Sequence, residues 1–104
     1  MKILDDPYSV ASICTKLYPY AVAVKDLPFI ADDKKLKTVT NVAVESLKQA
    51  RKESLKINKK ASINEDRLNT YIEKFKSQKT LDDSIKYMAN IIKKAQDADA
   101  KKGN

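Results

Sequence analysis

Apolar residues recur every three or four positions along most of this chain, the spacing that places them on one face of an α-helix. Four successive stretches show this pattern, and residues 29–102 contain no glycine or proline that would interrupt a helix. The four apolar stripes are Val10, Ile13, Cys14, Leu17, Ala21 and Val24; Leu36, Val39, Ala43, Leu47 and Ala50; Leu68, Tyr71, Ile72 and Phe75; and Leu81, Ile85, Met88, Ile92 and Ala95.

Helix start signals precede each stripe. A residue that accepts hydrogen bonds from the free amides of the first turn, or a carboxylate near the positive end of the helix dipole, favours a helix beginning. The loop before the third helix is expected around residues 58–61. The predicted starts are Asp6 with Pro7, Asp32 with Asp33, Ser62 with Glu65, and Thr80 with Asp83, the last two being capping boxes.

These elements predict one domain over residues 1–104, an all-α, up-and-down antiparallel bundle of four helices, because short connections make successive helices antiparallel. Pro19 lacks an amide proton, so we expect the first helix to be kinked or broken there. Residues 18–24 are rich in Val and Tyr, and the alternative is a three-helix bundle with an extended N-terminal segment. Beyond Gln96, residues 96–104 are expected to form a frayed tail.

Charge is distributed unevenly along the chain, whose formal net charge is +7. Residues 34–60 carry nine Lys or Arg against two Glu, and most of these cations fall opposite the apolar stripe of the second helix. Such a face suits a polyanion: RNA, DNA or an acidic protein surface. Because Lys lacks the planar fork with which Arg reads guanine, contact with the nucleic-acid backbone is the expected mode. The predicted polyanion-binding residues are Lys34, Lys37, Lys48, Arg51, Lys52, Lys56, Lys59 and Lys60.

Two other interpretations stay open. The basic face also fits the solvated surface of an ordinary helix, which is what charged runs usually are. A second functional class is a protein-interaction module, an inhibitor, immunity or phage-type accessory protein, with Tyr18 and Tyr20 as its contact residues. A stripe that the bundle leaves uncovered would lead to a homo-oligomer.

The residues that most enzymes need are missing from this sequence. Histidine is absent, and glycine occurs once, at Gly103, so neither a histidine base nor a glycine-rich phosphate loop is available. Cys14 lies on an apolar stripe and is expected to pack in the core. Three adjacent Asp pairs lie at predicted helix starts, where capping explains them without a metal. We therefore expect a protein that is not an enzyme and has no cofactor and no metal site.

Nothing in the pattern indicates a membrane segment. The longest apolar run, residues 20–24, is too short to cross a bilayer, and the first residues lack the apolar stretch of a secretory signal. Cys14 is the single cysteine and does not indicate an oxidising compartment. We expect a cytoplasmic protein without membrane insertion.

Two families share the outline of this chain. The Leu17, Tyr18, Pro19 sequence, followed by a long basic helix, resembles accessory proteins of diversity-generating retroelements, which implies an oligomeric nucleic-acid-binding partner of a reverse transcriptase. Its length, helix number and lysine content resemble bacteriocin immunity proteins. Neither resemblance includes a diagnostic motif, so we assign the chain to neither family.

Overall fold

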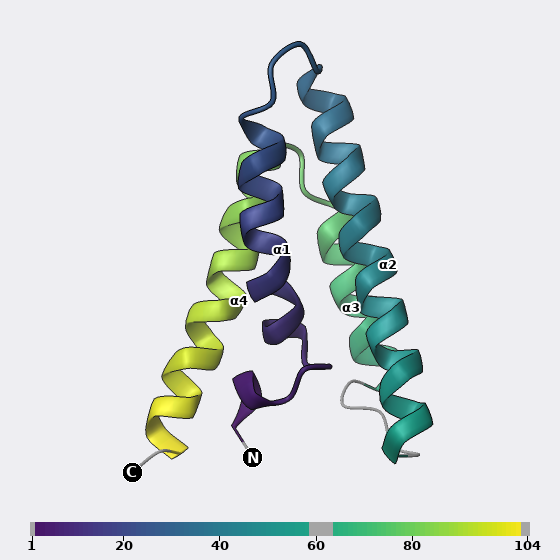
Figure 1. Ribbon diagram of the computed structural model, residues 1–104, viewed down its shortest axis with the longest axis vertical. Helices are drawn as coiled ribbons and strands as arrows, with labels where there is room; N and C mark the ends of the chain where they lie inside the picture. The colour runs from purple at the N-terminus through teal and green to yellow at the C-terminus, as the bar shows by residue number, and fades with distance from the viewer. Residues whose placement is uncertain (1, 59–63, 103–104) are drawn as a thin grey trace.

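The computed structural model describes residues 2–58 and 64–102, which hold four α-helices, one short 3₁₀ helix and no strand. Each α-helix runs opposite to the one before it (Figure 1), so the predicted up-and-down four-helix bundle is confirmed. The three-helix alternative is wrong, because residues 18–24 are helical. The elements are η1 (Ile3–Asp5), α1 (Val10–Lys25), α2 (Asp32–Asn58), α3 (Glu65–Lys76) and α4 (Leu81–Lys102).

Pro19 does not break the first helix. α1 is continuous from Val10 to Lys25, with Pro19 inside it. Pro19 offers no amide to the carbonyl of Thr15, but both residues are exposed, so water can hydrogen-bond that carbonyl. Leu17 and Ala21, which precede and follow Pro19, are both buried in the core. Tertiary packing therefore holds the two halves in one helix.

The first helix begins later than its predicted start at Asp6. Ser9 is the N-cap of α1, and its side chain accepts a hydrogen bond from the amide of Ser12 at 3.2 Å. The carboxylate of Asp6 instead accepts the amide of Tyr8 at 2.9 Å, which closes a turn before the helix. The predicted start is wrong because a serine three residues further on provides the cap.

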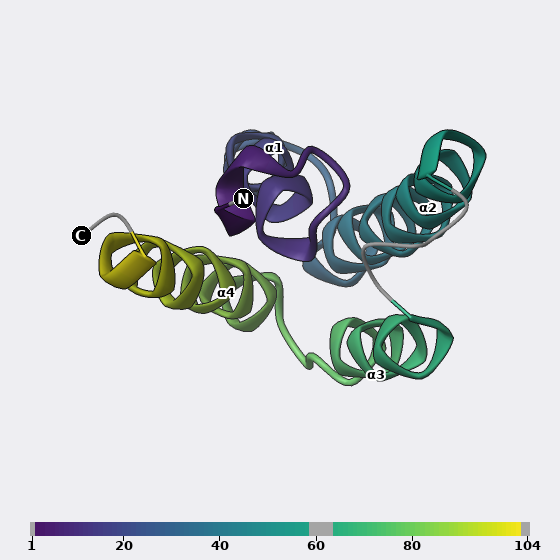
Figure 2. The same ribbon diagram turned by 90° about the horizontal axis from the view of Figure 1, so that it is seen from below.

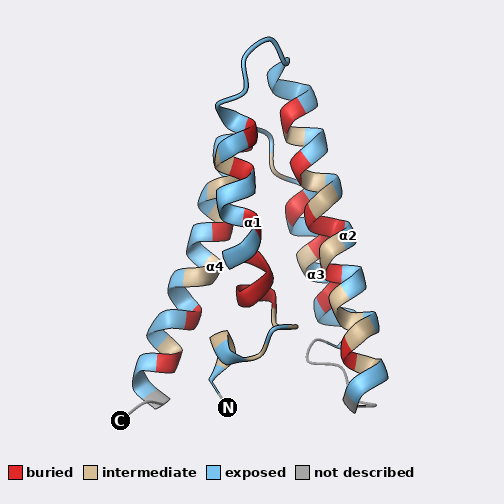
Figure 3. Cartoon of the chain, viewed as in Figure 1, coloured by how far each residue is buried: buried red, intermediate tan, exposed pale blue. Residues whose placement is uncertain are grey.

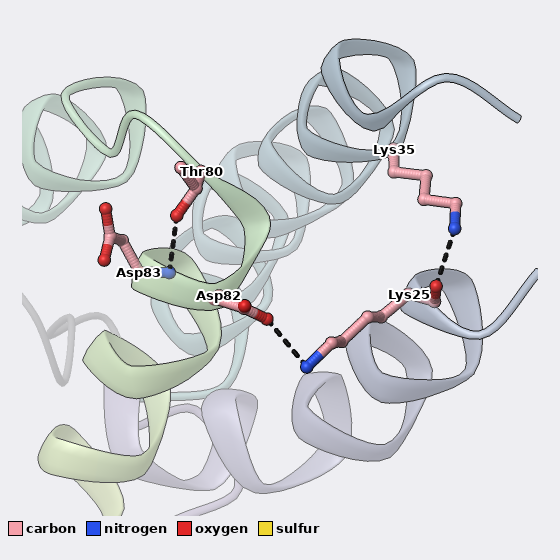
Figure 4. A network of polar contacts seen from close by, with 5 residues as sticks. All are labelled: Lys25, Lys35, Thr80, Asp82 and Asp83. Atoms are coloured by element: carbon pink, nitrogen blue, oxygen red, sulfur yellow. Dashed lines mark hydrogen bonds and ion pairs between the residues drawn. The ribbon is translucent and has the colours of Figure 1, made fainter.

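Two predicted helix starts agree with the structure. Asp32 and Asp33 lie in the first turn of α2. At the start of α4, the hydroxyl oxygen of Thr80 accepts the amide of Asp83 at 3.1 Å (Figure 4). Both helices thus begin where the capping pattern places them.

The N-cap of α3 differs from the predicted one. Asn64 caps this helix by accepting the amide of Arg67 at 2.8 Å. The predicted cap, Ser62, and most of the predicted loop over residues 58–61 lie outside the described residues. Asn and Ser are comparable N-caps, so composition alone does not choose between them.

Burial follows the predicted apolar stripes (Figure 3). Phe75, Leu47 and Met88 are among the largest fully buried side chains, and the ring of Phe75 meets that of Tyr87 edge to face, with centroids 5.0 Å apart. The buried core comprises Val10, Ile13, Cys14, Leu17, Ala21, Val24, Val39, Ala43, Val44, Leu47, Leu68, Ile72, Phe75, Leu81 and Met88.

The four helices do not pack equally. α1 packs most extensively on α4 and then on α2, whereas α3 packs mainly on α2. Seen along the helices, α3 stands away from α1 and α4 (Figure 2). The molecule measures 44 × 30 × 19 Å, so it is flat rather than square in cross-section. A cleft lined by residues of α3 and α4 lies on this side of the bundle.

The segment predicted to be a frayed tail is helical up to Lys102; residues 103–104 lie outside the described residues. Asp99 explains this difference. It lies one turn beyond Ala95 on the buried stripe, is 6% exposed, and accepts the amides of Ile3 at 2.7 Å and Leu4 at 2.8 Å. This carboxylate anchors the N-terminal segment to α4 and gives the last turns of the helix a buried contact.

Two lysines fix the end of α1 (Figure 4). Lys35 is 8% exposed, and its ammonium donates a hydrogen bond to the backbone carbonyl of Lys25 at 2.6 Å, which withdraws one of the nine cations of residues 34–60 from solvent. The ammonium of Lys25 pairs with Asp82 at 2.8 Å. Hydrogen bonding and opposite charge raise the pKa of Lys25 and lower the pKa of Asp82. α1 is thereby tied to both α2 and α4.

Candidate polyanion interface

The predicted basic face is present as a row of exposed side chains on α2. Lysines at both ends of the helix are exposed, and the row extends for about 33 Å at 1.5 Å per residue. We call this row the α2 strip. Its members are Lys34, Lys37, Lys48, Lys52 and Lys56.

The two glutamates of α2 reduce the charge of the strip without cancelling it. Glu45 and Glu53 line a shallow cleft together with Ile13 and Leu17 of α1. Glu53 also pairs with Lys56 at 3.7 Å, a distance at which an exposed ion pair contributes little. Glu45 is exposed on the same face of α2 as the strip, one turn before Lys48, whereas Glu53 lies at the edge nearer α1. With five lysines against these two glutamates, the strip keeps a net positive charge.

Two further lysines extend the positive surface beyond α2. Lys76 ends α3 and Lys79 follows in the turn to α4, and both line a groove with Lys37. The sequence did not indicate them, because acidic residues nearly cancel the cations after position 60. The same groove includes Asp32 and Asp33, so its charge is less one-sided than that of the strip.

Arg51, another predicted polyanion contact, is less accessible than the lysines of the α2 strip. It is only partly exposed, and its Nε atom is enclosed without a hydrogen-bond partner in the part of the chain that the structure describes. Arg51 lies toward the edge of the apolar stripe, so part of the guanidinium is withdrawn from solvent. Lys59 and Lys60, the remaining predicted contacts, lie outside the described residues.

Tyr18 and Tyr20, the predicted protein contacts, are each 37% exposed on α1. Two residues along a helix correspond to a rotation of about 200°, so the two rings face different directions. The structure therefore does not bring them together into one contact patch.

A more exposed apolar group lies in the turn between α1 and α2. Phe29 is fully exposed at 105%, and Leu27 and Ile30 are exposed at its sides. Phe29 also has a φ of 65°, in the left-handed region that disfavours a bulky side chain. The sequence predicts only a connection between two helices here, because Pro28 lies in this segment.

Cys14 is buried, as the stripe predicted. No part of its side chain is exposed, and burial raises the pKa of the thiol to about 12. The thiolate is the reactive form of cysteine, so this thiol is unsuited to nucleophilic chemistry at neutral pH.

The described residues contain neither a candidate metal site nor a candidate membrane-spanning helix. Over residues 2–58 and 64–102, no group of three or more His, Cys, Asp or Glu side chains is placed to hold a metal ion. Across the same ranges, no helix combines the length and apolar character needed to cross a membrane.

Comparison with protein-family models, with curated proteins and with solved structures gives no significant match.

Proposed function

We propose that this protein binds nucleic acid through the α2 strip and contacts the phosphate backbone with little preference for base sequence. The observation that carries this proposal is the excess of exposed lysines on α2, where the five lysines of the strip stand against two glutamates along about 33 Å of helix. Such an excess of ammonium groups is attracted to any dense line of phosphates.

The dimensions of the strip support this proposal. Its length of about 33 Å is close to one turn of duplex DNA, about 34–36 Å. Every member of the strip is a lysine, and a flexible ammonium can follow a phosphate backbone without a fixed geometry. The strip is convex, as expected for a helix lying along or across a backbone.

The test is a titration of the protein into a labelled DNA duplex and a labelled single-stranded RNA, followed by fluorescence anisotropy at several salt concentrations. If about five phosphates of the duplex are neutralised, the log of the affinity should fall with the log of the salt concentration with a slope of about −4.5. Changing Lys34, Lys37, Lys48 and Lys52 to Gln should reduce that slope to about −0.9.

A matched variant controls for net charge. Changing four exposed lysines away from α2, namely Lys16, Lys86, Lys93 and Lys101, to Gln removes the same charge. This control variant should keep most of the affinity and most of the slope. The proposal fails if neither DNA nor RNA binds at low salt, or if both variants lose affinity equally.

A second candidate function, a protein-interaction module, is favoured by the turn between α1 and α2. A fully exposed aromatic ring on strained backbone is costly unless something uses it. Phe29→Asp should then abolish capture of a protein partner, or self-association measured by light scattering, whereas the four-lysine α2 variant should not. Loss of capture with the lysine variant alone would instead favour an acidic partner on the α2 strip.

A further inference from the structure

A cleft of about 800 Å³ opens where α3 stands away from α1 and α4. Residues of α3 form one wall and residues of α4 form the other, and the N-terminal segment and the start of α1 close its lower end. On α3 the lining runs from Arg67 to Lys74, about 10 Å of helix, and Gln78 follows just beyond the end of α3. We call it the α3–α4 cleft.

The lining of the α3–α4 cleft is apolar at its base. Val10 and Ala11 of α1 and Ala95 of α4 are almost completely buried there, and Ile91 is partly buried. Such a surface favours an apolar group over water, at about 25 cal/mol for each Å² that is covered.

Four cations surround this base: Lys2, Arg67, Lys74 and Lys94, all exposed and all lining the cleft. Asp6 is the one acid among the described lining residues, and its carboxylate already accepts the amide of Tyr8. Within the ranges that the structure describes, none of the four cations forms an ion pair.

Polar groups that can orient a ligand also line the cleft. Tyr71, Tyr87 and Asn90 all line the cleft. The guanidinium of Arg67 lies 6.0 Å from the centre of the Tyr71 ring, which holds the cation against the α3 wall. Burial raises the pKa of Tyr87 to about 12, so at neutral pH its hydroxyl keeps the proton that it can donate.

We propose that the α3–α4 cleft binds a small organic anion with an apolar or aromatic body, the body on Val10, Ala11, Ile91 and Ala95 and the anionic group held by Arg67, Lys94 and their neighbours. Its volume lies within the roughly 300–1,000 Å³ that is usual for small-molecule sites. The charged lining residues of α3 and α4 are exposed and Ile91 is only partly buried, so a ligand with apolar and anionic parts matches both properties of the lining. This site is distinct from the α2 strip and does not depend on it.

The probe for this site is anilinonaphthalene sulfonate, a fluorescent dye with an aromatic body and one sulfonate. Titrated into the native protein and followed by fluorescence and calorimetry, it should bind with a stoichiometry of one per chain. Its uncharged analogue phenylnaphthylamine, which keeps the aromatic body without the sulfonate, should bind at least tenfold more weakly. Equal affinity for the two dyes would overturn the role assigned to the cations.

Paired variants locate the dye. Arg67→Gln with Lys94→Gln should weaken dye binding by about tenfold or more, because two cations that hold the sulfonate are lost. Lys48→Gln with Lys52→Gln removes the same charge from the α2 strip and should change the affinity less than twofold. Equal weakening by the two pairs, or several dyes per chain, would show general attraction to a basic protein and overturn the proposal.

Two further measurements do not depend on those variants. Amide chemical shifts should move at Val10, Tyr71 and Ile91 when the dye is added, while those of the α2 strip stay in place. An unlabelled oligonucleotide should leave the dye bound. If the oligonucleotide displaces the dye, the cleft belongs to a nucleic-acid surface and the proposal of a small anion is wrong.

Discussion

The α2 strip and the α3–α4 cleft are both positively charged, but they differ in shape and in the origin of their charge. The strip is a convex row of lysines from one helix. The cleft is concave, with an apolar base, tyrosine hydroxyls and cations from three separate segments, represented by Lys2, Arg67 and Lys94. The strip suits an extended polyanion, whereas the cleft suits a compact ligand that also has apolar surface.

This difference shows that positive charge alone does not define a ligand. Ammonium groups surrounded by water are screened by salt, so binding to the strip should depend strongly on ionic strength. In the cleft, other positive charges lie beside apolar surface. Covering that surface contributes binding free energy that salt does not screen. Salt dependence is therefore a direct way to tell the two surfaces apart.

The largest expected effect is on stability, and it tests whether buried packing holds α3, one wall of the cleft, in place. Phe75 is completely buried in α3 and packs against Tyr87, so Phe75→Ala should lower the free energy of unfolding by about 3–5 kcal/mol. Urea unfolding followed by circular dichroism measures this change. Amide exchange should accelerate more in α3 than in α2, because α3 packs mainly on α2 while α2 also contacts α1 and α4.

The same substitution at Phe29 is the control, because that ring is fully exposed. Phe29→Ala should change the free energy of unfolding by no more than about 0.5 kcal/mol. If Phe75→Ala does not fold, Phe75→Leu retains most of the buried volume and should show the same order of exchange rates. Equal acceleration of amide exchange in α2 and α3 would contradict the expectation that α3, one wall of the cleft, is held less firmly than α2.

An intermediate effect is expected at the lower end of the cleft. Asp99→Ala removes the acceptor of the Ile3 and Leu4 amides and should cost about 1–3 kcal/mol. Those two amides should also exchange faster. Asp97→Ala, an exposed change in the same turn of α4, should stay within about 0.5 kcal/mol. Unchanged exchange at both amides would mean that Asp99 does not hold the N-terminal segment.

The smallest expected effect concerns the pKa of Tyr87, whose phenol lines the cleft and is partly withdrawn from water. The phenol should titrate near pH 12 instead of the ordinary 10.0. Because the unfolded chain releases this proton first, the stability that the neutral phenol contributes is complete below about pH 10 and is lost as the pH rises toward 12.

Ultraviolet titration of the native protein, with helicity monitored in parallel, measures this step. Tyr87→Phe should remove the tyrosine ionisation seen at the highest pH. Tyr20→Phe, which removes an exposed phenol hydroxyl outside the cleft, should leave that step in place. A late step that survives Tyr87→Phe would place the buried phenol elsewhere.

The fold was predictable because apolar spacing reports helix faces directly. Leu47, Phe75 and Met88 lie on the stripes that define the helices, and all three are fully buried. The α2 strip was predictable for a related reason, since its charges are neighbours in sequence. Local signals of this kind need no knowledge of how distant segments meet.

What the sequence did not reveal depends on contacts between distant residues. Asp99 resembles part of a polar tail until it is seen with the amides of Ile3 and Leu4, which are more than 90 positions away. Pro19 was expected to kink or break the first helix, and packing of its neighbours on both sides keeps that helix continuous. The cations of the α3–α4 cleft come from separate segments, each of which carries acids of its own, so charge counting did not detect them.

The pairing of α1 with α4 has a consequence for synthesis on the ribosome. α1 is made first, but its most extensive partner is the last helix of the bundle. At about 5–20 residues per second, several seconds pass while residues 26–80 are added. During that time the apolar face of α1 can be covered only by α2 or by a chaperone, so the nascent chain is most vulnerable to aggregation just before α4 emerges.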